Sequence, residues 1–397
     1  MKFTDKWQII YISKILRRKR MINCDIIVVG AGASGLAAAF AAAQRGQRVI
    51  VLERNDAPAK KLLATGNGRC NFSNRKAMFS AELVGFFSEC LGIEAVEEDG
   101  RFYPRSFEAK TVADALVGGL EMAGAQIICG ARVVSVCNNE MAYTVRTEDG
   151  RFFLSKAVIL ATGGKAGIQF GCYGDGYKLA EKLGHSIVKP VPALDALTCA
   201  EDLSQLHGVR VRAKAFLQRS QDGGAFEETA SEEGEVQFTK TAVSGICVMD
   251  LSGKVRLAEG TAYRLVIDLF PEKKLSELEY SLSYRQRMFG VMLKGLVPEK
   301  LAQYIENSAG KDPAACAAMA KALTFTVTGT KGWKNAQVTC GGVPLSEVDG
   351  MFRSKASDEL YIVGELLDYD GPCGGFNLNW AFHTGLTAGM FAVTEGL

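Results

Sequence analysis

The sequence is poor in the features that mark metal sites and membrane spans. It has only three histidines among 397 residues, and its 11 cysteines form no Cys-x-x-Cys pair and no Cys/His spacing typical of metal sites. A histidine-rich metal site is therefore disfavoured, and we expect free thiols in a reducing, cytoplasmic compartment. No stretch approaches 18 consecutive apolar residues, so no integral membrane segment is expected.

The sequence also lacks an excess of charge of one sign. It carries 46 Lys and Arg against 44 Asp and Glu, and because basic residues cluster in residues 1–20, the remainder is mildly acidic. A nucleic-acid-binding surface is not favoured. We interpret residues 1–20 as an extension before a more natural start at Met21; the alternative is an amphipathic segment on a membrane surface. The length and the 48% apolar content predict a globular protein of two or three domains.

A strand–helix–strand unit opens the chain after Met21. An apolar strand is followed by a glycine-rich turn, a helix that is apolar nearly all round, and a second apolar strand. The predicted ranges are 24–29 for the first strand, 30–43 for the turn and helix, and 48–53 for the second strand.

The turn has the pattern Gly30-x-Gly32-x-x-Gly35. The first glycine permits the tight turn, the second lets the backbone approach a pyrophosphate, and the third permits close packing of helix and strand. The helix N-terminus, at Ala33 and Ser34, offers free N–H groups and the positive end of the helix dipole to phosphates.

An acidic residue ends the second strand. Glu53 lies about 20 residues after the first glycine of the turn, where a carboxylate can accept hydrogen bonds from both ribose hydroxyls. Its neighbour Arg54 is a further expected contact. Because strand, turn, helix and acid occur in register, the unit is expected to bind a dinucleotide rather than to be a turn without a ligand.

Later segments favour FAD over NAD. One apolar strand ends in Thr162-Gly163-Gly164; another ends in Gly364-Glu365 and precedes a helix that opens with Gly375-Phe376-Asn377. An extended cofactor needs such distributed contacts: a turn for pyrophosphate, an acid near ribitol and a helix N-terminus under the flavin. An NAD dehydrogenase would instead continue into a separate catalytic domain.

The character of the chain changes near residue 190, which suggests one dinucleotide-binding domain split by an insertion. The segment after residue 190 alternates like a β-rich module, and the pattern from about 271 to 325 is helical. The charge run Glu227–Glu235 is interpreted as a solvated loop. The predicted boundaries are 1–20 for the extension, 21–190 and 335–397 for the two parts of the FAD-binding domain, 191–256 for the β-rich insert, and 257–334 for a helical cap and return.

The motifs resemble those of the bacterial FAD-dependent flavoproteins that include the bile-acid 4,6-reductase and aminoacetone oxidase-like proteins, relatives of glutathione-reductase and fumarate-reductase flavoproteins. The resemblance covers residues 23–397. It implies bound FAD and an α/β fold in which a Rossmann-type FAD-binding domain is split by a β-barrel-like insert and a helical cap. It rests on the glycine turn, the unusual block 60–74 (KKLLATGNGRCNFSN), and segments 99–104, 161–164, 174–177, 238–245, 338–343 and 364–380.

The resemblance also implies roles for individual residues. A loop in block 60–74 closes over FAD, two acids lie near the ribitol or pyrophosphate, and the start of the last helix lies near the flavin ring. The implied loop residues are Lys61, Gly66, Asn67, Arg69, Cys70 and Asn71; the acids are Asp175 and Glu365; Val133 is a further expected cofactor contact.

Three residues are candidate proton donors: Tyr173, Lys240 and His383. A packing histidine is the alternative for the last, and an anion-binding or exposed strand lysine for the second. The family commonly has His at the position of Lys240 and Ser-Thr at Cys172-Tyr173.

Two further sets of residues leave alternatives open. Arg69 is interpreted as a bidentate phosphate clamp or as an exposed loop arginine. The thiols of Cys70, Cys340 and Cys373 are interpreted as small buried fillers, with a redox pair as the alternative.

The favoured hypothesis is an FAD oxidoreductase that exchanges hydride with a small hydrophobic substrate. The resemblance implies NAD(P)H-driven reduction of a C=C bond conjugated to a carbonyl, as in steroid-like acids. No second GxGxxG follows a strand, so NADH or NADPH would bind transiently. The alternatives are an oxidase of an amine or alcohol that uses oxygen, and a flavin-bearing or RNA-associated protein without turnover. The oligomeric state is left open.

Overall fold

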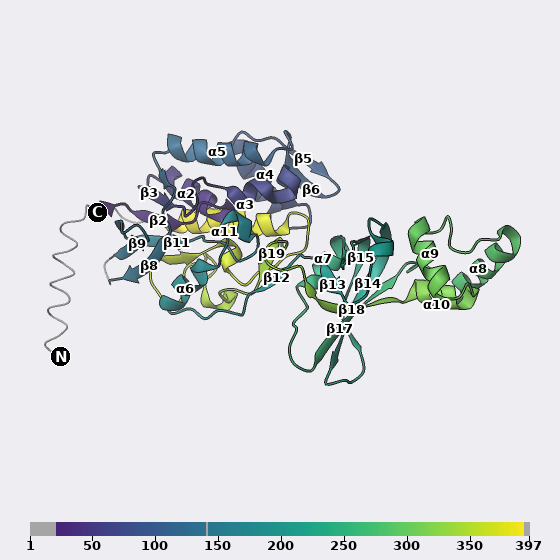
Figure 1. Cartoon of the computed structure of the whole chain (residues 1–397). Coiled ribbons are helices and arrows are strands. Elements are labelled where there is room, and N and C mark those ends of the chain that lie inside the picture. Colours follow the sequence, from purple (N-terminus) through teal and green to yellow (C-terminus); the bar gives the residue numbers. More distant parts are fainter. Residues whose placement is uncertain (1–20, 140–141, 393–397) are drawn as a thin grey trace. The chain divides into compact units, whose positions relative to one another are not determined.

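The computed structural model describes residues 21–139 and 142–392, which form two compact units (Figure 1). Unit 1 combines the chain up to Pro190 with the chain from Val338, and unit 2 is Val191–Gln337. The predicted extension, residues 1–20, lies outside the described residues. Unit 1 is thus discontinuous in sequence, with unit 2 inserted between its parts.

Unit 1 is built on a five-stranded parallel sheet in the order β20-β11-β2-β3-β7. Its central strands are short runs of Val, Ile, Leu and Ala that are fully buried, as strands covered on both faces must be. This confirms the predicted Rossmann-type α/β fold. The strands are β2 (Ile26–Val29), β3 (Val49–Leu52), β7 (Gln126–Ile128), β11 (Ala157–Leu160) and β20 (Leu360–Ile362).

Helix α2 (Ala33–Gln44) packs against both α11 (Phe376–Phe391) and α5 (Ala109–Met122) (Figure 1). Two glycines of α11 allow the close approach: a Cβ at Gly385 would collide with the carbonyl oxygen of Ser34, and a Cβ at Gly389 with that of Ala38. The beginning and the end of the chain therefore pack together beside the sheet.

Two small sheets complete unit 1. The apolar segments 126–136 and 152–160 are each divided between two strands that belong to different sheets. The second break falls at Lys156, where the N–H groups of Lys156 and Ala157 both donate to the carbonyl of Asp25. The four-stranded sheet contains β1 (Ile22–Asn23), β10 (Phe152–Ser155), β9 (Tyr143–Thr147) and β8 (Val133–Asn138); the three-stranded sheet contains β4 (Ser73–Asn74), β6 (Arg101–Pro104) and β5 (Ala95–Glu98).

The remaining elements of unit 1 are short. They are α3 (Lys60–Ala64), η1 (Thr65–Gly68), α4 (Ser80–Gly85), η2 (Phe86–Cys90), η3 (Ile168–Phe170), α6 (Asp175–Lys182), β19 (Val338–Cys340), η5 (Leu345–Glu347) and η6 (Gly364–Leu366).

Unit 2 contains a closed antiparallel barrel in the order β13-β16-β15-β14-β17-β18, which confirms the predicted β-barrel-like insert. Three helices connect β17 to β18, so the segment 257–334, predicted as a helical cap, also supplies two barrel strands. The elements are β12 (Val191–Ala193), β13 (Leu197–Cys199), η4 (Ser204–Leu206), β14 (Arg210–Gln221), β15 (Glu227–Phe238), β16 (Ala242–Ser244), α7 (Ile246–Ser252), β17 (Thr261–Asp268), α8 (Leu275–Phe289), α9 (Glu299–Ser308), α10 (Pro313–Lys321) and β18 (Leu323–Thr330).

The interpretation of Glu227–Glu235 as a solvated loop is wrong: this segment is most of strand β15. Three of its five glutamates lie opposite basic residues of β14 in the ladder: Glu227 faces Arg219, Glu233 faces Lys214 and Glu235 faces Arg212. Opposite charges across an antiparallel pair are favourable, so the strand tolerates a charge run that would repel itself in isolation.

Each unit has its own hydrophobic core. The core of unit 1 surrounds the parallel sheet, and the core of unit 2 fills the barrel and continues under α8, α9 and α10. Within the described ranges, no helix has the length and apolarity needed to cross a bilayer.

Candidate cofactor-binding site

The turn between β2 and α2 is built from glycines and leaves open space at the middle one, Gly32. Gly30 has a φ of 106°, and a Cβ there would collide with the carbonyl oxygen of Ala161; a Cβ at Gly35 would collide with the carbonyl oxygen of Gly30. By contrast, a Cβ at Gly32 would meet no atom within 4 Å, and no described side chain caps the helix that follows. An uncapped helix N-terminus that faces open space at Gly32 fits a pyrophosphate.

Glu53 is held in a fixed orientation at the end of β3. Its side chain is buried, and its two carboxylate oxygens accept hydrogen bonds from the backbone N–H groups of Ala31 and Asn55, each at 2.8 Å. One bond comes from the phosphate turn itself, so the carboxylate and the turn are positioned together. Each oxygen retains a lone pair that can accept a ribose hydroxyl.

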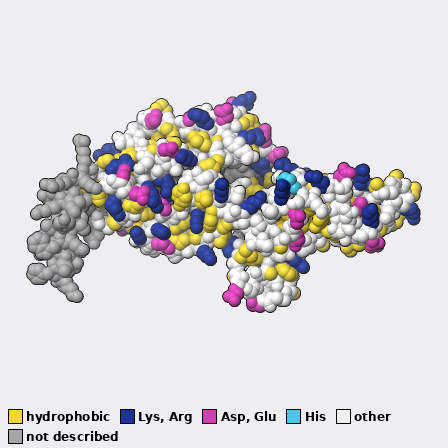
Figure 2. Space-filling model, in the orientation of Figure 1, with side chains coloured by type: hydrophobic (Ala, Val, Ile, Leu, Met, Phe, Trp, Pro, Cys, Tyr) yellow, Lys and Arg dark blue, Asp and Glu magenta, His cyan; other side chains and the backbone are white. Residues whose placement is uncertain are grey.

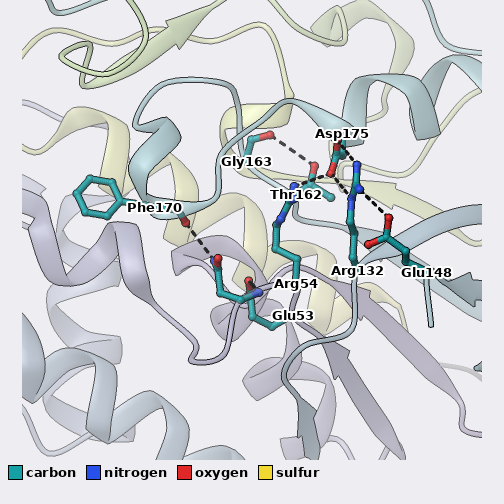
Figure 3. Close-up of polar contacts among 9 residues, drawn as sticks. Glu53, Arg54, Arg132, Glu148, Thr162, Gly163, Phe170 and Asp175 are labelled. Carbon is teal, nitrogen blue, oxygen red and sulfur yellow. Dashed lines mark hydrogen bonds and ion pairs between the residues drawn. The ribbon is translucent and has the colours of Figure 1, made fainter.

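Asp175, the first residue of α6, is held by two arginines (Figure 3). Arg54 Nη1 lies 2.5 Å from Oδ2 of Asp175, and Arg132 approaches the same carboxylate with Nε at 3.1 Å and Nη2 at 3.3 Å. Burial raises the pKa of Asp175, but hydrogen bonding from Arg132 and the two positive charges outweigh it, and the pKa is lowered from its usual value. The carboxylate therefore stays ionised.

Beside this cluster lies a pocket of about 350 Å³, lined by Arg54, Gly130, Arg132, Glu148 and Asp149. Arg132 also donates from Nη1 to Glu148 at 2.9 Å (Figure 3). The predicted contact Val133 is buried and begins β8 directly after Arg132. Over the face of unit 1 shown in Figure 2, basic and acidic side chains are interspersed. The pocket thus offers both donors and acceptors.

Tyr173 belongs to the same corner. The guanidinium of Arg54 lies over its ring, 4.5 Å from the centroid, and the side chain is 55% exposed. His383 instead contacts Phe79 and Phe352, so these two candidate proton donors have different contact partners.

The loop in block 60–74 is tied to the C-terminal part of unit 1. Lys61 Nζ lies 2.5 Å from Oε2 of Glu365, and the other oxygen of Glu365 accepts the N–H of Thr339 at 2.8 Å. The hydroxyl of Thr339 in turn accepts the N–H groups of Lys165 and Ala166, at 2.8 and 3.0 Å. Four segments that are distant in sequence converge here, close to Gly164, where a Cβ would lie 2.7 Å from Glu365.

The loop has an unusual backbone. Gly66, Asn67 and Cys70 all have positive φ, near 56°, and a Cβ at Gly66 would lie 2.9 Å from the side chain of Asn71. Cys70 is fully buried, and burial raises the pKa of its thiol to about 12. A neutral buried thiol suits the role of a small filler better than that of a redox centre.

Arg69 is engaged on the outer side of this loop. Its Nη2 lies 2.7 Å from Glu98, and its guanidinium lies over the rings of Tyr103 and Phe107, at 4.7 and 4.4 Å. These contacts support neither of the two sequence interpretations directly: the side chain links the loop to neighbouring aromatic rings. None of the 11 cysteines, all of which lie in the described ranges, forms a disulfide bond.

The start of α11 forms a second glycine-rich N-terminus. Gly375 precedes the helix with a φ of 102°, a Cβ there would collide with the carbonyl of Ser73, and no described side chain caps it. Asn377 fixes the preceding turn, since its amide accepts from the N–H of Gly371 at 2.9 Å and donates to the carbonyl at 2.8 Å. Phe376 is the first residue of the helix.

Further along α11, His383 is packed between rings. It stacks on Phe79 with a centroid separation of 3.5 Å and an interplanar angle of 2°, and Phe352 meets it edge-on. Burial lowers the pKa of His383, against a smaller opposite effect of Glu82. The stacking and the lowered pKa of His383 favour the packing alternative over a proton donor near neutral pH.

Lys240 lies in unit 2, in the turn between β15 and β16, and its side chain is exposed. Two residues that contact the predicted acids were not among the residues predicted from the sequence. Arg132, which binds Asp175, carries no motif signal. Thr339, which binds Glu365, falls in the segment 338–343 that contributed to the family resemblance. Within the described chain, no group of three or more His, Cys, Asp or Glu is arranged to hold a metal ion.

A model of the HI0933-like protein Rossmann domain matches residues 24–89 and 77–391, so the chain belongs to this family of FAD-dependent flavoproteins. It is an FAD-dependent oxidoreductase. The uncapped glycine turn, the oriented carboxylate of Glu53 and the second glycine-rich helix start fit that cofactor, which when bound supplies or accepts hydride.

The similarity to known proteins extends over nearly the whole chain. The chain is 34% identical to a 3-dehydro-bile acid delta(4,6)-reductase of Clostridium scindens, over 92% of this chain and 98% of that protein. It is 26% identical to a ribosomal RNA dihydrouridine synthase of Escherichia coli, over 91% and 96%. The fold is similar to the open conformation of a flavocytochrome c3 fumarate reductase, with a TM-score of 0.53, 17% identity, and coverage of 99% of this chain and 81% of that one.

Proposed function

We propose that this enzyme reduces a C=C bond conjugated to a carbonyl in a hydrophobic, steroid-like small molecule, with NADH or NADPH as the electron donor. The observation that carries the proposal is the similarity, at 34% identity over 92% of the chain, to a reductase named for a 3-dehydro bile acid and its delta(4,6) bonds. A keto group at carbon 3 with double bonds at 4 and 6 is a conjugated dienone.

The protein has two tasks in such a reaction. It must hold the cofactor and the enone in register, and it must give a proton to the carbon that does not receive hydride. Glu53, the glycine turn and the start of α11 are proposed to hold the cofactor. Lys240 is proposed as the proton donor, because it is an exposed cation where the family commonly has another proton-carrying side chain, while His383 is stacked and neutral.

The decisive experiment is anaerobic. The flavin absorbance of the purified protein is followed while NADH and then NADPH is added, and a steroid with a 4-ene-3-one group is added to the bleached enzyme. Bleaching followed by recovery is expected; the saturated 3-ketosteroid serves as the matched acceptor that should not restore the absorbance. If neither nucleotide bleaches the flavin, the reductase proposal fails, and amines and alcohols are tested with peroxide as the readout of an oxidase.

Lys240→Ala tests the assignment of the donor. Turnover is expected to fall by roughly 10²–10⁴, the range for loss of a general acid, while FAD stays bound and bleaching by nucleotide is unchanged. Lys254→Ala, another exposed lysine of unit 2, is the control. Full turnover in Lys240→Ala would return this residue to an ordinary surface lysine.

A second candidate is dihydrouridine formation in RNA. It is favoured by the two ribosomal RNA dihydrouridine synthases, from Escherichia coli and Haemophilus influenzae, which the chain matches over 91% and 90% of its length. The chemistry is related, since the C5=C6 bond of uracil is conjugated to the C4 carbonyl. Recovery of the bleached flavin by ribosomal RNA, with dihydrouridine detected by mass spectrometry, and no recovery by steroid, would replace the first proposal with this one.

A further inference from the structure

Helix α8 of unit 2 carries an exposed apolar stripe. Tyr280, Tyr284 and Met288 are spaced by four residues, so they share one face, and they are 73%, 41% and 55% exposed. Leu278 and Leu282, on the other side of the helix, are fully buried and attach α8 to the core of unit 2. The packing of α8 onto unit 2 therefore uses its leucine face and leaves the stripe of Tyr280, Tyr284 and Met288 exposed.

The C-terminal end of α8 is hydrogen-bonded to the loop that follows it. Arg285 donates from Nε to the carbonyl of Met292 at 2.8 Å and from Nη2 to that of Lys294 at 2.6 Å. Tyr284 is also met edge-on by Phe289, itself 65% exposed, with centroids 6.2 Å apart. Exposed aromatic side chains grouped on one helix are typical of a contact surface.

The charges that flank the stripe are self-complementary. Glu277 precedes it and Arg287 follows it, and both lie on the same side of the helix as the two tyrosines. One oxygen of Glu277, Oε2, caps α8 by accepting the N–H of Lys274 at 3.0 Å, which leaves Oε1 for a partner. Leu282 is midway between Glu277 and Arg287, and also midway between Tyr280 and Tyr284. If two copies of α8 are laid antiparallel about a twofold axis at Leu282, each Glu277 meets the other Arg287, and each Tyr280 meets the other Tyr284.

We propose that α8 is a dimerisation surface whose partner is a second copy of this chain, paired antiparallel through the stripe and its two flanking charges. A twofold contact needs one patch that complements itself, and the order of charges and tyrosines along α8 does so. The paired segment from Glu277 to Arg287 is about 15 Å long. Because one helix pair is a small interface, a weak dimer in the micromolar range is expected.

The test is analytical ultracentrifugation of the FAD-loaded full chain over a range of concentrations. The wild type is expected to shift from monomer to dimer as concentration rises. Arg287→Glu brings like charges together in both halves of the contact and is expected to raise the dissociation constant about tenfold or more. The double variant Glu277→Arg with Arg287→Glu restores opposite charges and is expected to recover the dimer.

Two controls separate this outcome from damage to the helix. Glu279→Arg makes the same change of charge as Glu277→Arg but lies two residues on, away from the stripe, and should leave the dimer intact. Tyr280→Ser should weaken the dimer with no change in circular dichroism, because its side chain is mostly exposed. Glu277→Arg also removes the capping hydrogen bond from the N–H of Lys274, so the helix content of the double variant is checked by circular dichroism. A wild type that stays monomeric at every concentration, or a double variant with wild-type circular dichroism that dimerises no better than Arg287→Glu, would overturn the proposal.

Discussion

Glu53 is the residue on which the proposed dinucleotide site most depends, because it binds the phosphate turn through Ala31 and is available to the ribose. Glu53→Ala is expected to weaken FAD binding about 10- to 100-fold, since a hydrogen bond to a charged group contributes about 1.5–3 kcal/mol. Fluorescence titration of the apoprotein with FAD measures this. Glu121→Ala, which removes an exposed carboxylate from α5, should bind FAD like the wild type, and equal affinities in both variants would remove Glu53 from the site.

His383 should make stability depend on pH. Its pKa is lowered in the folded protein, so the unfolded chain takes up a proton first as the pH falls below the usual value of 6.5. The stability present above that value is therefore lost as the pH falls towards the folded pKa. Denaturant midpoints at pH 7.5 and 5.5 should differ more for the wild type than for His383→Phe, which keeps a ring against Phe79.

For single residues, the sequence identified which residues belong to the candidate site better than it identified which residues they contact. The glycines and Glu53 follow from local backbone requirements, which a short motif records. The contacts of Asp175 with Arg54 and Arg132, and of Thr339 with the loop after β11, join segments far apart in the chain. No local pattern specifies such a contact, which explains why Arg132 was missed.

At the scale of elements, two glycines in the turn before α2 are expected to have different roles. Gly35 is needed for the fold, and Gly32 is needed for FAD binding. Gly35→Ala places a methyl group against the carbonyl of Gly30 and should destabilise unit 1 by about 1–3 kcal/mol. Gly32→Ala meets no protein atom within 4 Å at a φ of −84°, so the apoprotein should keep its stability while the methyl group obstructs the pyrophosphate, and FAD affinity should fall at least about tenfold.

Thermal unfolding of the apoprotein and FAD titration, done on both variants, distinguish the two effects. Gly118→Ala in α5, also with open space around the added methyl group, is the control and should be neutral or slightly stabilising. A Gly32→Ala variant with normal FAD affinity would show that the pyrophosphate does not pass this glycine.

The elements were predicted where one local signal sufficed. Helix α5 (Ala109–Met122) is an element that its own sequence explains, because its apolar positions recur with the helical period. The apolar run 152–160 gave no sign that it serves two sheets, since the break at Lys156 depends on the carbonyl of Asp25. Strand β15 was mistaken for a loop because three of its five glutamates are balanced by bases on a neighbouring strand, which no single-strand pattern contains.

For the whole molecule, two separate cores predict two separate unfolding events. The proposed FAD-binding residues of the two glycine-rich helix starts, with Glu53, all belong to unit 1, whereas β17 and the cap helices belong to the core of unit 2. Differential scanning calorimetry should therefore resolve two transitions. FAD at about 1,000 times its dissociation constant should stabilise only one of them, by about 4 kcal/mol.

Matched core substitutions identify which transition is which. Leu160→Ala in β11 and Leu265→Ala in β17 both truncate a fully buried side chain and should each cost about 2–5 kcal/mol. The first should lower the FAD-sensitive transition and the second the FAD-insensitive one. A single transition that FAD and both substitutions move together would mean that the two cores unfold as one cooperative system, because stabilisation of either core would then be transmitted to the other.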